Sequence, residues 1–312
     1  MPTQHTYTKV SQRLSLRTYL SLAFLPAIKR SDSKSPLNSL IRRARAWPNY
    51  QEMHQKPGVR CLREILRTDT VKFVMLVRNY LDAYLANAYL VNEDMVDEAD
   101  SPNLRLPGKG IVLYDDNDIN LLSNIDNEEI LLSVVQDYIL GTVSDALRIA
   151  EGLEPDSPSA TVWSFRQYSH LCLAHHARWD ILALPGTDAH PLPLLVFFVP
   201  PWEFGTEDFT ELTDAQRFQP PHALDAPATN AHKLWAVIHD TCLTRGRFFI
   251  VSNYTQWAFG ELSPDDTQAT ITTAFEAPIL AFNGKYRATP ALGCNVIEML
   301  VFWTRWALGP RP

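Results

Sequence analysis

Glycine, cysteine and long apolar runs are scarce in this sequence. Only 12 of its 312 residues are glycine, against 22 prolines, which excludes a collagen-like repeat. The longest mostly apolar run covers residues 191–202 and contains four prolines, whereas a membrane-spanning helix needs about 20 apolar residues. We therefore expect a folded protein without a transmembrane segment.

The four cysteines stand singly, and no complete catalytic motif accompanies them. Cys61, Cys172, Cys242 and Cys294 form no CxxC pair and follow no secretory apolar region, which is typical of reduced thiols in an intracellular, nuclear or cytoplasmic protein. The phosphate-loop, dinucleotide-binding, GxSxG and HExxH patterns are also missing. These enzyme classes are excluded, and no cofactor is indicated.

Charge is distributed unevenly along the chain. Residues 1–78 hold fifteen Lys and Arg against four Asp and Glu, a net charge of +11, and the remaining residues carry −18. A basic segment attracts polyanions, and nucleic acids release counterions when they bind one. Two kinds of partner remain open: nucleic acid, and an acidic protein surface, which includes the acidic body of the same chain. The candidate nucleic-acid contacts are Arg42, Arg43, Arg45, Arg60, Arg63 and Arg67.

The first 31 residues contain five basic residues and no acid before Asp32. This composition is typical of a mitochondrial presequence. However, leucines at positions 14, 16, 20 and 22 follow neither a helical nor a strand period. An ordered basic arm is therefore the alternative to a targeting segment.

Periodicity divides the chain into a basic arm with a short helix (1–60), a helical region (61–126) and an α+β core (127–312). Helices are predicted over 62–90, 127–150, 229–245 and 294–308, and a proline-rich loop over 200–227. Strands are predicted over 161–165, 171–174, 179–184, 194–199, 248–252, 256–261 and 267–275. The predicted fold is α+β, with one mixed central sheet flanked by helices.

Three segments of the predicted core carry a family resemblance. They are residues 178–184 (RWDILAL), residues 194–201 (LLVFFVPP), and residues 247–254 (RFFIVSNY) with the following hairpin. Together with the element order, they resemble the PD-(D/E)XK, restriction-endonuclease-like nuclease superfamily, in a degenerate form of the kind found in fungal proteins. The resemblance covers residues 127–262 and implies a nuclease-like core in which Asp180 stands on the metal-aspartate strand and Glu128 or Glu129 on the first helix.

The sequence departs from this family at the metal site. The chemistry needs two acidic ligands for Mg²⁺ and a lysine that orients the attacking water. The position of the family's Glu-x-Lys reads FFVP at residues 197–200, and the next carboxylate is Glu203. A hydrophobic strand cannot hold a hard cation, so we expect no metal site, with Asp180 as a residue at the end of a strand.

Other polar candidates have ordinary structural explanations. His170 and Cys172 share a strand face and could hold zinc, but no second ligand pair lies near them in the sequence. His239 follows Trp235 by one helical turn, which favours a packed pair over a catalytic base. Cys242 lies on the same predicted helix, where nucleophiles are rarely exposed. The dense aromatic residues near the C-terminus indicate core packing.

Three hypotheses follow. The leading one is a catalytically inactive, nuclease-fold binding protein that acts through nucleic-acid or protein contacts of its basic N-terminal region. The second is an active Mg²⁺-dependent nuclease with a migrated site, which would use Asp180, Glu203 and Glu128 or Glu129. The third is a structural subunit of a larger intracellular assembly that binds no nucleic acid.

Overall fold

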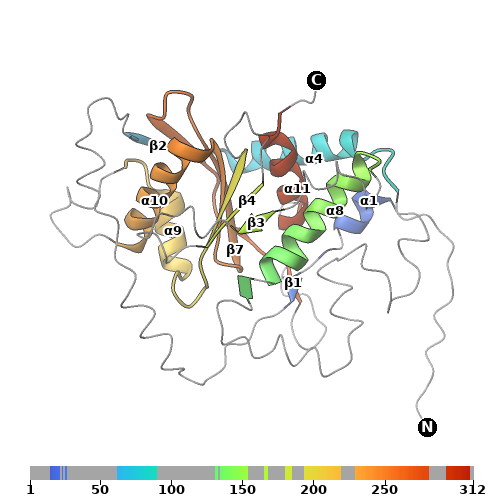
Figure 1. Cartoon of the computed structure of the whole chain (residues 1–312), viewed down its shortest axis with the longest axis horizontal. Helices are drawn as coiled ribbons and strands as arrows, with labels where there is room; N and C mark the ends of the chain where they lie inside the picture. The colour runs from blue at the N-terminus through green and yellow to red at the C-terminus, as the bar shows by residue number, and fades with distance from the viewer. Residues whose placement is uncertain are drawn as a thin grey trace, which may run out of the picture.

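The computed structural model shown in Figure 1 describes residues 15–21, 23, 25–26, 62–89, 131–132, 134–153, 165–167, 180–184, 193–218, 229–280 and 293–309. In these residues one mixed sheet lies between two helical layers. One layer holds α9 (Thr206–Asp214) and α10 (Asn230–Arg245). The other holds α1 (Leu16–Ser21), α4 (Thr70–Tyr84), the π-helical segment η2 (Val134–Leu140), α8 (Gly141–Ala150) and α11 (Val296–Ala307). The predicted α+β class is confirmed.

The sheet orders its strands β2-β8-β7-β6-β5-β4-β3, and β9 pairs with β7. β2 is parallel to β8 and β5 is parallel to β6, whereas the other neighbours are antiparallel. The strands are β2 (Glu64–Arg67), β3 (Arg166–Gln167), β4 (Asp180–Leu184), β5 (Leu194–Phe198), β6 (Phe248–Ser252), β7 (Gln256–Leu262), β8 (Gln268–Ile271) and β9 (Phe275–Glu276).

The apolar run of β5 is explained by its place inside the sheet. Side chains alternate between the two faces of a strand. Phe197 is buried in the core between the sheet and the layer of α9 and α10. Phe198 is buried in the core between the sheet and the layer that holds α4, α8 and α11. All five β5 residues are fully buried. A central strand covered by helices on both faces therefore needs apolar residues at every position.

The C-terminal helix α11 is the centre of the larger core. Asn295 caps it by accepting a hydrogen bond from the Glu298 backbone N–H, and the Glu298 side chain accepts one from the Asn295 N–H in return. Trp303 donates to the Phe249 carbonyl at 3.2 Å, while the ring of Phe302 meets Tyr80 of α4 edge-on. α11 therefore packs on the sheet with one face and on α4 with another, and its aromatic residues form part of the core.

The predicted helix over 62–90 differs from the structure at its beginning. Residues 64–67 form β2, and α4 begins only at Thr70, where the Asp69 carboxylate accepts a hydrogen bond from the Lys72 N–H. The apolar residues of 62–67 fit a helical period, but the backbone of Ile65 donates to the Gln216 carbonyl and the segment pairs with β8. Tertiary hydrogen bonds therefore override the local pattern here.

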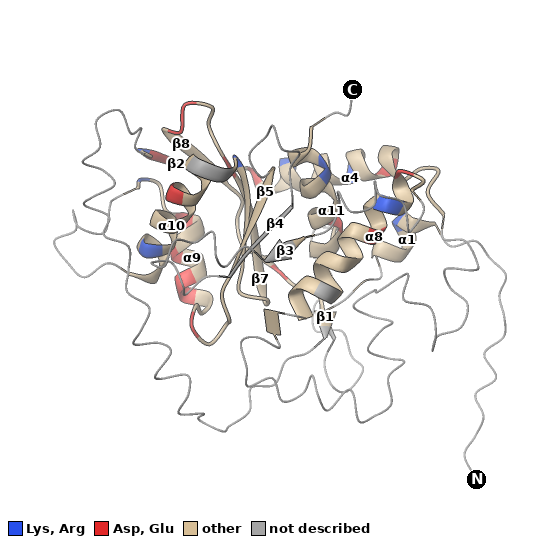
Figure 2. Cartoon of the chain, in the orientation of Figure 1, with Lys and Arg blue, Asp and Glu red and all other residues tan. Residues whose placement is uncertain are grey.

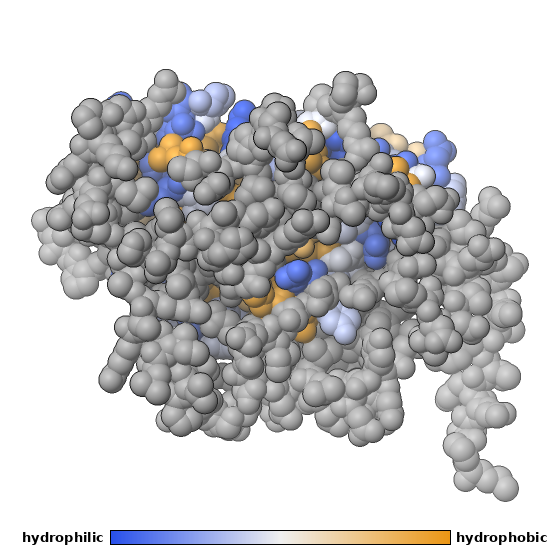
Figure 3. All heavy atoms as spheres, in the orientation of Figure 1, coloured by the Kyte–Doolittle hydropathy of each residue, from blue (hydrophilic) through white to orange (hydrophobic). Residues whose placement is uncertain are grey.

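Two further segments differ from the predicted pattern. The loop expected over 200–227 contains α9, whose Phe209 and Leu212 face the sheet. Within the predicted basic arm, α1 buries Leu16 and Leu20 in the core, and β1 (Leu25–Pro26) pairs with β10 (Ile279–Leu280). The described parts of 1–60, 61–126 and 127–312 thus share one core. Figure 3 shows some of the apolar side chains of the described residues, with polar side chains beside them.

Candidate functional site

Asp180 is the first residue of β4, at one end of the central sheet. The backbone register aligns it with Phe198 of β5, aligns Phe198 with Ser252 of β6, and aligns Ser252 with Trp257 of β7. This row crosses four strands. The predicted strand over 179–184 is present as β4, and it pairs with β5 in an antiparallel manner.

The neighbouring strand offers no metal ligand. Leu194 to Phe198 present only apolar side chains, and Val199 and Pro200 that follow them are also buried. Magnesium takes oxygen ligands, and none of these side chains supplies one. Among the residues that the structure describes, no three His, Cys, Asp or Glu side chains are grouped closely enough to hold a metal ion.

Of the other predicted carboxylates, the structure describes only Glu203. Glu203 is half-buried in the turn after β5, where its backbone N–H donates to the Pro200 carbonyl at 3.0 Å. Glu128 and Glu129 lie outside the described residues, as do His170, Cys172, His175 and His176.

A buried polar cluster stands at the β6–β7 turn, beyond the end of β5. The Asn253 amide donates to the Phe204 carbonyl at 2.9 Å, and its oxygen accepts from the Gln256 backbone N–H at 2.7 Å. Ser252 accepts from the Tyr254 N–H at 2.9 Å, and Tyr254 adopts a φ of 76°, which is rare outside glycine. Burial raises the pKa of Tyr254 well above its usual value. The cluster anchors the loop after β5 to the hairpin.

In the sequence, only the polar residues between the two predicted strands indicated this cluster. The residues between the two predicted strands are polar, which indicates a hairpin connection but not a buried network. Asn253 is buried because its amide reaches across the sheet end to Phe204, 49 positions earlier in the chain. The arrangement is a closed, hydrogen-bonded turn that joins the β6–β7 hairpin to the segment after β5.

His239 is a structural histidine in the core of α10. Its side chain is fully buried, and Nε2 accepts a hydrogen bond from the Leu62 backbone N–H at 3.1 Å. Trp235 is buried one turn earlier and donates to the Leu212 carbonyl at 2.9 Å. Burial raises the pKa of the adjacent Asp240 to about 7. His239 and Trp235 are thus both buried, and their ring contacts are with Phe218 and Phe249 respectively.

Cys242 is not poised as a nucleophile. It is buried on α10, and desolvation raises the pKa of its thiol far above the usual value, with a smaller contribution from Asp266. A catalytic cysteine needs the opposite shift, because the thiolate is the attacking species.

The basic candidates divide into two groups. Arg42, Arg43, Arg45 and Arg60 lie outside the described residues. Arg63 and Arg67 are exposed at β2, and the Arg67 guanidinium forms an ion pair of 3.0 Å with Asp214 at the end of α9. Figure 2 shows the acidic residues gathered on α9 beside this contact. At this point the basic N-terminal region touches the acidic body of its own chain, which was one of the predicted alternatives.

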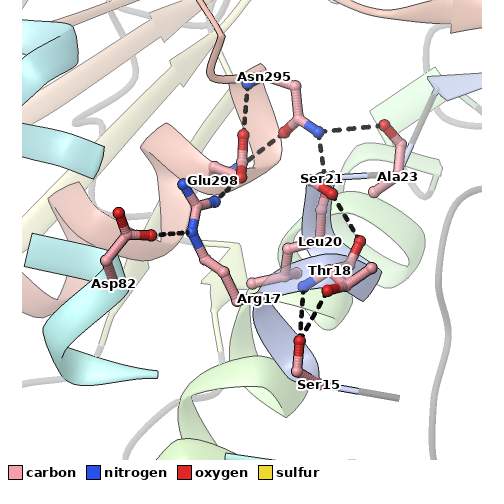
Figure 4. Close-up of polar contacts among 9 residues, drawn as sticks. All are labelled: Ser15, Arg17, Thr18, Leu20, Ser21, Ala23, Asp82, Asn295 and Glu298. Carbon is pink, nitrogen blue, oxygen red and sulfur yellow. Dashed lines mark hydrogen bonds and ion pairs between the residues drawn. The ribbon is translucent and has the colours of Figure 1, made fainter. Parts of the chain in front are cut away.

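Arg17 has an internal role. Figure 4 shows its guanidinium between the carboxylates of Glu298 on α11 and Asp82 on α4. Glu298 is 2% exposed, and the nitrogen-to-oxygen distance to Asp82 is 2.9 Å. The Asn295 amide also donates to the Leu20 carbonyl at 2.7 Å, which fastens α1 to the start of α11. This basic residue is therefore part of the folded core.

Comparisons with family models, curated proteins and solved structures found no match. Among the described residues, no helix has both the length and the apolar character needed to cross a membrane.

Proposed function

We propose that this chain is a catalytically inactive, nuclease-fold binding protein whose basic N-terminal region contacts an anionic partner, nucleic acid or an acidic protein surface. The observation that carries the proposal is β5. At the position where the resemblance implies an acid and a lysine, Phe197, Phe198 and Val199 fill both cores. A strand that is needed for packing on both faces has no position left for a hydrated cation.

The order of the elements supports a nuclease-like core. α8 is followed by β3, β4 and β5, in which each strand is antiparallel to the next. α10 then crosses to the opposite face of the sheet and leads into β6, which is parallel to β5. The resemblance rests on this sequence of helix, strands, helix and strand, with Asp180 at the beginning of β4.

The first experiment tests for catalysis. The full chain is incubated with supercoiled plasmid and with single-stranded RNA, in Mg²⁺ or in EDTA. We expect no cleavage in either condition. The control variant is Asp214→Ala, at the end of α9. Cleavage that needs Mg²⁺, is lost in Asp180→Ala and is kept in Asp214→Ala would overturn the proposal. It would favour the nuclease that uses Asp180, Glu203 and Glu128 or Glu129.

The second experiment tests for binding of an anion. Affinity for a 20-base-pair duplex is measured by fluorescence anisotropy between 50 and 300 mM salt. We expect the logarithm of the association constant to fall by about 0.9 per neutralised phosphate for each tenfold rise in salt. Charge reversal of Arg42, Arg43 and Arg45 should flatten that slope. The same reversal at Arg217, Lys233 and Arg247 is the matched control.

The result also separates the remaining alternatives. Tight binding to a polyglutamate peptide, with none to the duplex, would assign the basic region to an acidic protein surface. No binding to either at 50 mM salt would overturn the proposal and leave the structural subunit of an assembly.

A further inference from the structure

His239 of α10 contacts two segments that are far apart in the sequence. Its Nε2 accepts a hydrogen bond of 3.1 Å from the backbone N–H of Leu62, which stands two residues before β2. Its ring lies 5.7 Å from the ring of Phe218, measured between centroids. The imidazole is fully buried, so both contacts are made away from solvent.

The two segments lie side by side at the edge of the sheet. β2 is the last strand on its side of the sheet, with β8 as its neighbour. Residues 216–218 run along the opposite edge of β2, where the Ile65 N–H donates to the Gln216 carbonyl at 3.0 Å and the Phe218 N–H donates to the Arg63 carbonyl at 3.3 Å. One side chain of α10 therefore holds both the beginning of β2 and the segment that covers it.

The hydrogen bond to Leu62 fixes the protonation state of His239. A backbone N–H can only donate, so Nε2 must present its lone pair, and the ring proton of the neutral imidazole is on Nδ1. A proton added to Nε2 would remove the acceptor and set two N–H groups against each other. The closed arrangement would then contain a buried charge and a buried N–H without its acceptor, and both are costly in a core.

The charged and titratable groups of the described segments around the ring do not compensate for a positive charge on it. The nearest acid, Asp240, lies 3.8 Å from Nδ1, but burial raises its pKa to about 7, so it is protonated at lower pH. Cys242, one turn further along α10, is held as a neutral thiol because burial raises its pKa. Arg63, Glu64 and Arg217, on the two segments that pack against the ring, are exposed to solvent.

We propose that His239 is a pH-sensitive latch at this edge of the sheet. The neutral imidazole holds the beginning of β2 and residues 216–218 against α10, and protonation releases both segments. α10 itself stays in place, because Leu234, Trp235 and Ile238 bury it against the sheet independently of the latch. The inference is independent of the proposed function.

The size of the effect follows from the proton that opening takes up. The closed latch does not accept a proton on Nε2, whereas a histidine exposed to water has a pKa of about 6.5. The closed state is therefore fully favoured above that pH and loses stability as the pH falls below it. Relative to pH 8, the equilibrium constant for opening should rise about tenfold at pH 5.5 and about a hundredfold at pH 4.5.

Amide hydrogen exchange of the full chain, measured by NMR between about pH 4.5 and 8 and corrected for the intrinsic exchange rate, tests this. Protection of the Leu62 and Phe218 amides should fall by these factors, whereas protection of Ile250 in the central strand β6 should not. His239→Gln should abolish the pH dependence at Leu62, because a glutamine oxygen can accept a hydrogen bond but does not titrate. His232→Gln, at a half-buried histidine of the same helix, is the matched control and should keep it.

Three results would overturn the proposal. The first is protection of the Leu62 amide that stays constant from pH 8 to 4.5. The second is an equal loss at Ile250, which would assign the change to unfolding of the whole chain. The third is a pH dependence that persists in His239→Gln. The comparison of Leu62 with Ile250 is made in the unaltered chain, so the test stands even where the variant does not fold.

Discussion

Replacing Arg17 with methionine would leave the Glu298 carboxylate buried without its cation. Glu298 is 2% exposed, so water cannot take the place of the guanidinium. Removing one partner of a buried ion pair costs about 3–5 kcal/mol, because the remaining charge keeps its full desolvation penalty. Methionine retains the apolar stem of the arginine, so the change isolates the loss of charge rather than of packing.

The matched variant removes both charges. In Arg17→Met with Glu298→Gln, the amide oxygen of glutamine can still accept the hydrogen bond of the Asn295 N–H. We therefore expect the double variant to recover at least about half of the lost stability, because no uncompensated charge stays buried. Asp82→Asn is the control, since Asp82 is 59% exposed and should cost about 1 kcal/mol or less.

Urea unfolding monitored by tryptophan fluorescence measures all four chains under the same conditions. The eight tryptophans report the core in which Trp257 and Trp303 are buried. An Arg17→Met chain that unfolds within about 1 kcal/mol of the wild type would refute the reasoning, because the pair would then contribute no more than a surface contact. A double variant that is no more stable than Arg17→Met alone would refute the coupling between the two charges.

Three further predictions concern other parts of the core. Burial raises the pKa of Asp240 to about 7, so the folded chain holds this proton more tightly than the unfolded chain, and the associated stability is complete below about pH 4 and is lost as pH rises to 7. In Asp240→Asn, urea midpoints measured from pH 4 to 8 should lose this decline and exceed the wild type at pH 8, and a parallel decline would contradict the assignment. Gly260→Ala should lower the free energy of unfolding by about 2 kcal/mol or more in the same urea assay. The added Cβ would overlap the Phe249 ring and come within 2.7 Å of the Thr270 carbonyl oxygen. An unchanged free energy of unfolding would mean that β7 can shift. Deletion of residues 293–312 removes α11 and should leave an insoluble chain, whereas a soluble monomer by size-exclusion chromatography would show that the sheet folds without it.

At the candidate site, the strands were predictable from the sequence, whereas the buried polar cluster was not. Strands were predicted over 179–184 and 194–199, and the structure has β4 at 180–184 and β5 at 194–198. Phe197 and Phe198 lie on opposite faces of the sheet, as alternation along a strand requires. The Asn253 cluster was not foreseen, because its defining contact with Phe204 joins residues that are distant in the sequence.

Arg17 shows the same limit for charge. Its neighbours in the sequence are basic or neutral, so composition favoured an accessible arm or a targeting segment. The acids that bind it, Asp82 and Glu298, lie 65 and 281 positions away. The net charge of a sequence segment therefore does not predict whether its arginines are exposed, because folding can bring carboxylates to them from distant positions.

What the sequence alone determined are the elements whose signal is local. The helices predicted over 229–245 and 294–308 and the strand predicted over 248–252 are present as α10, α11 and β6, because apolar periodicity acts within a few positions. Only the tertiary structure decided that residues 64–67 form a strand, since a four-residue segment gains its hydrogen bonds from β8 and from Gln216 rather than from itself. It likewise decided that α1 belongs to the core, because burial of Leu16 and Leu20 requires the surfaces of α4 and α11, which form far along the chain.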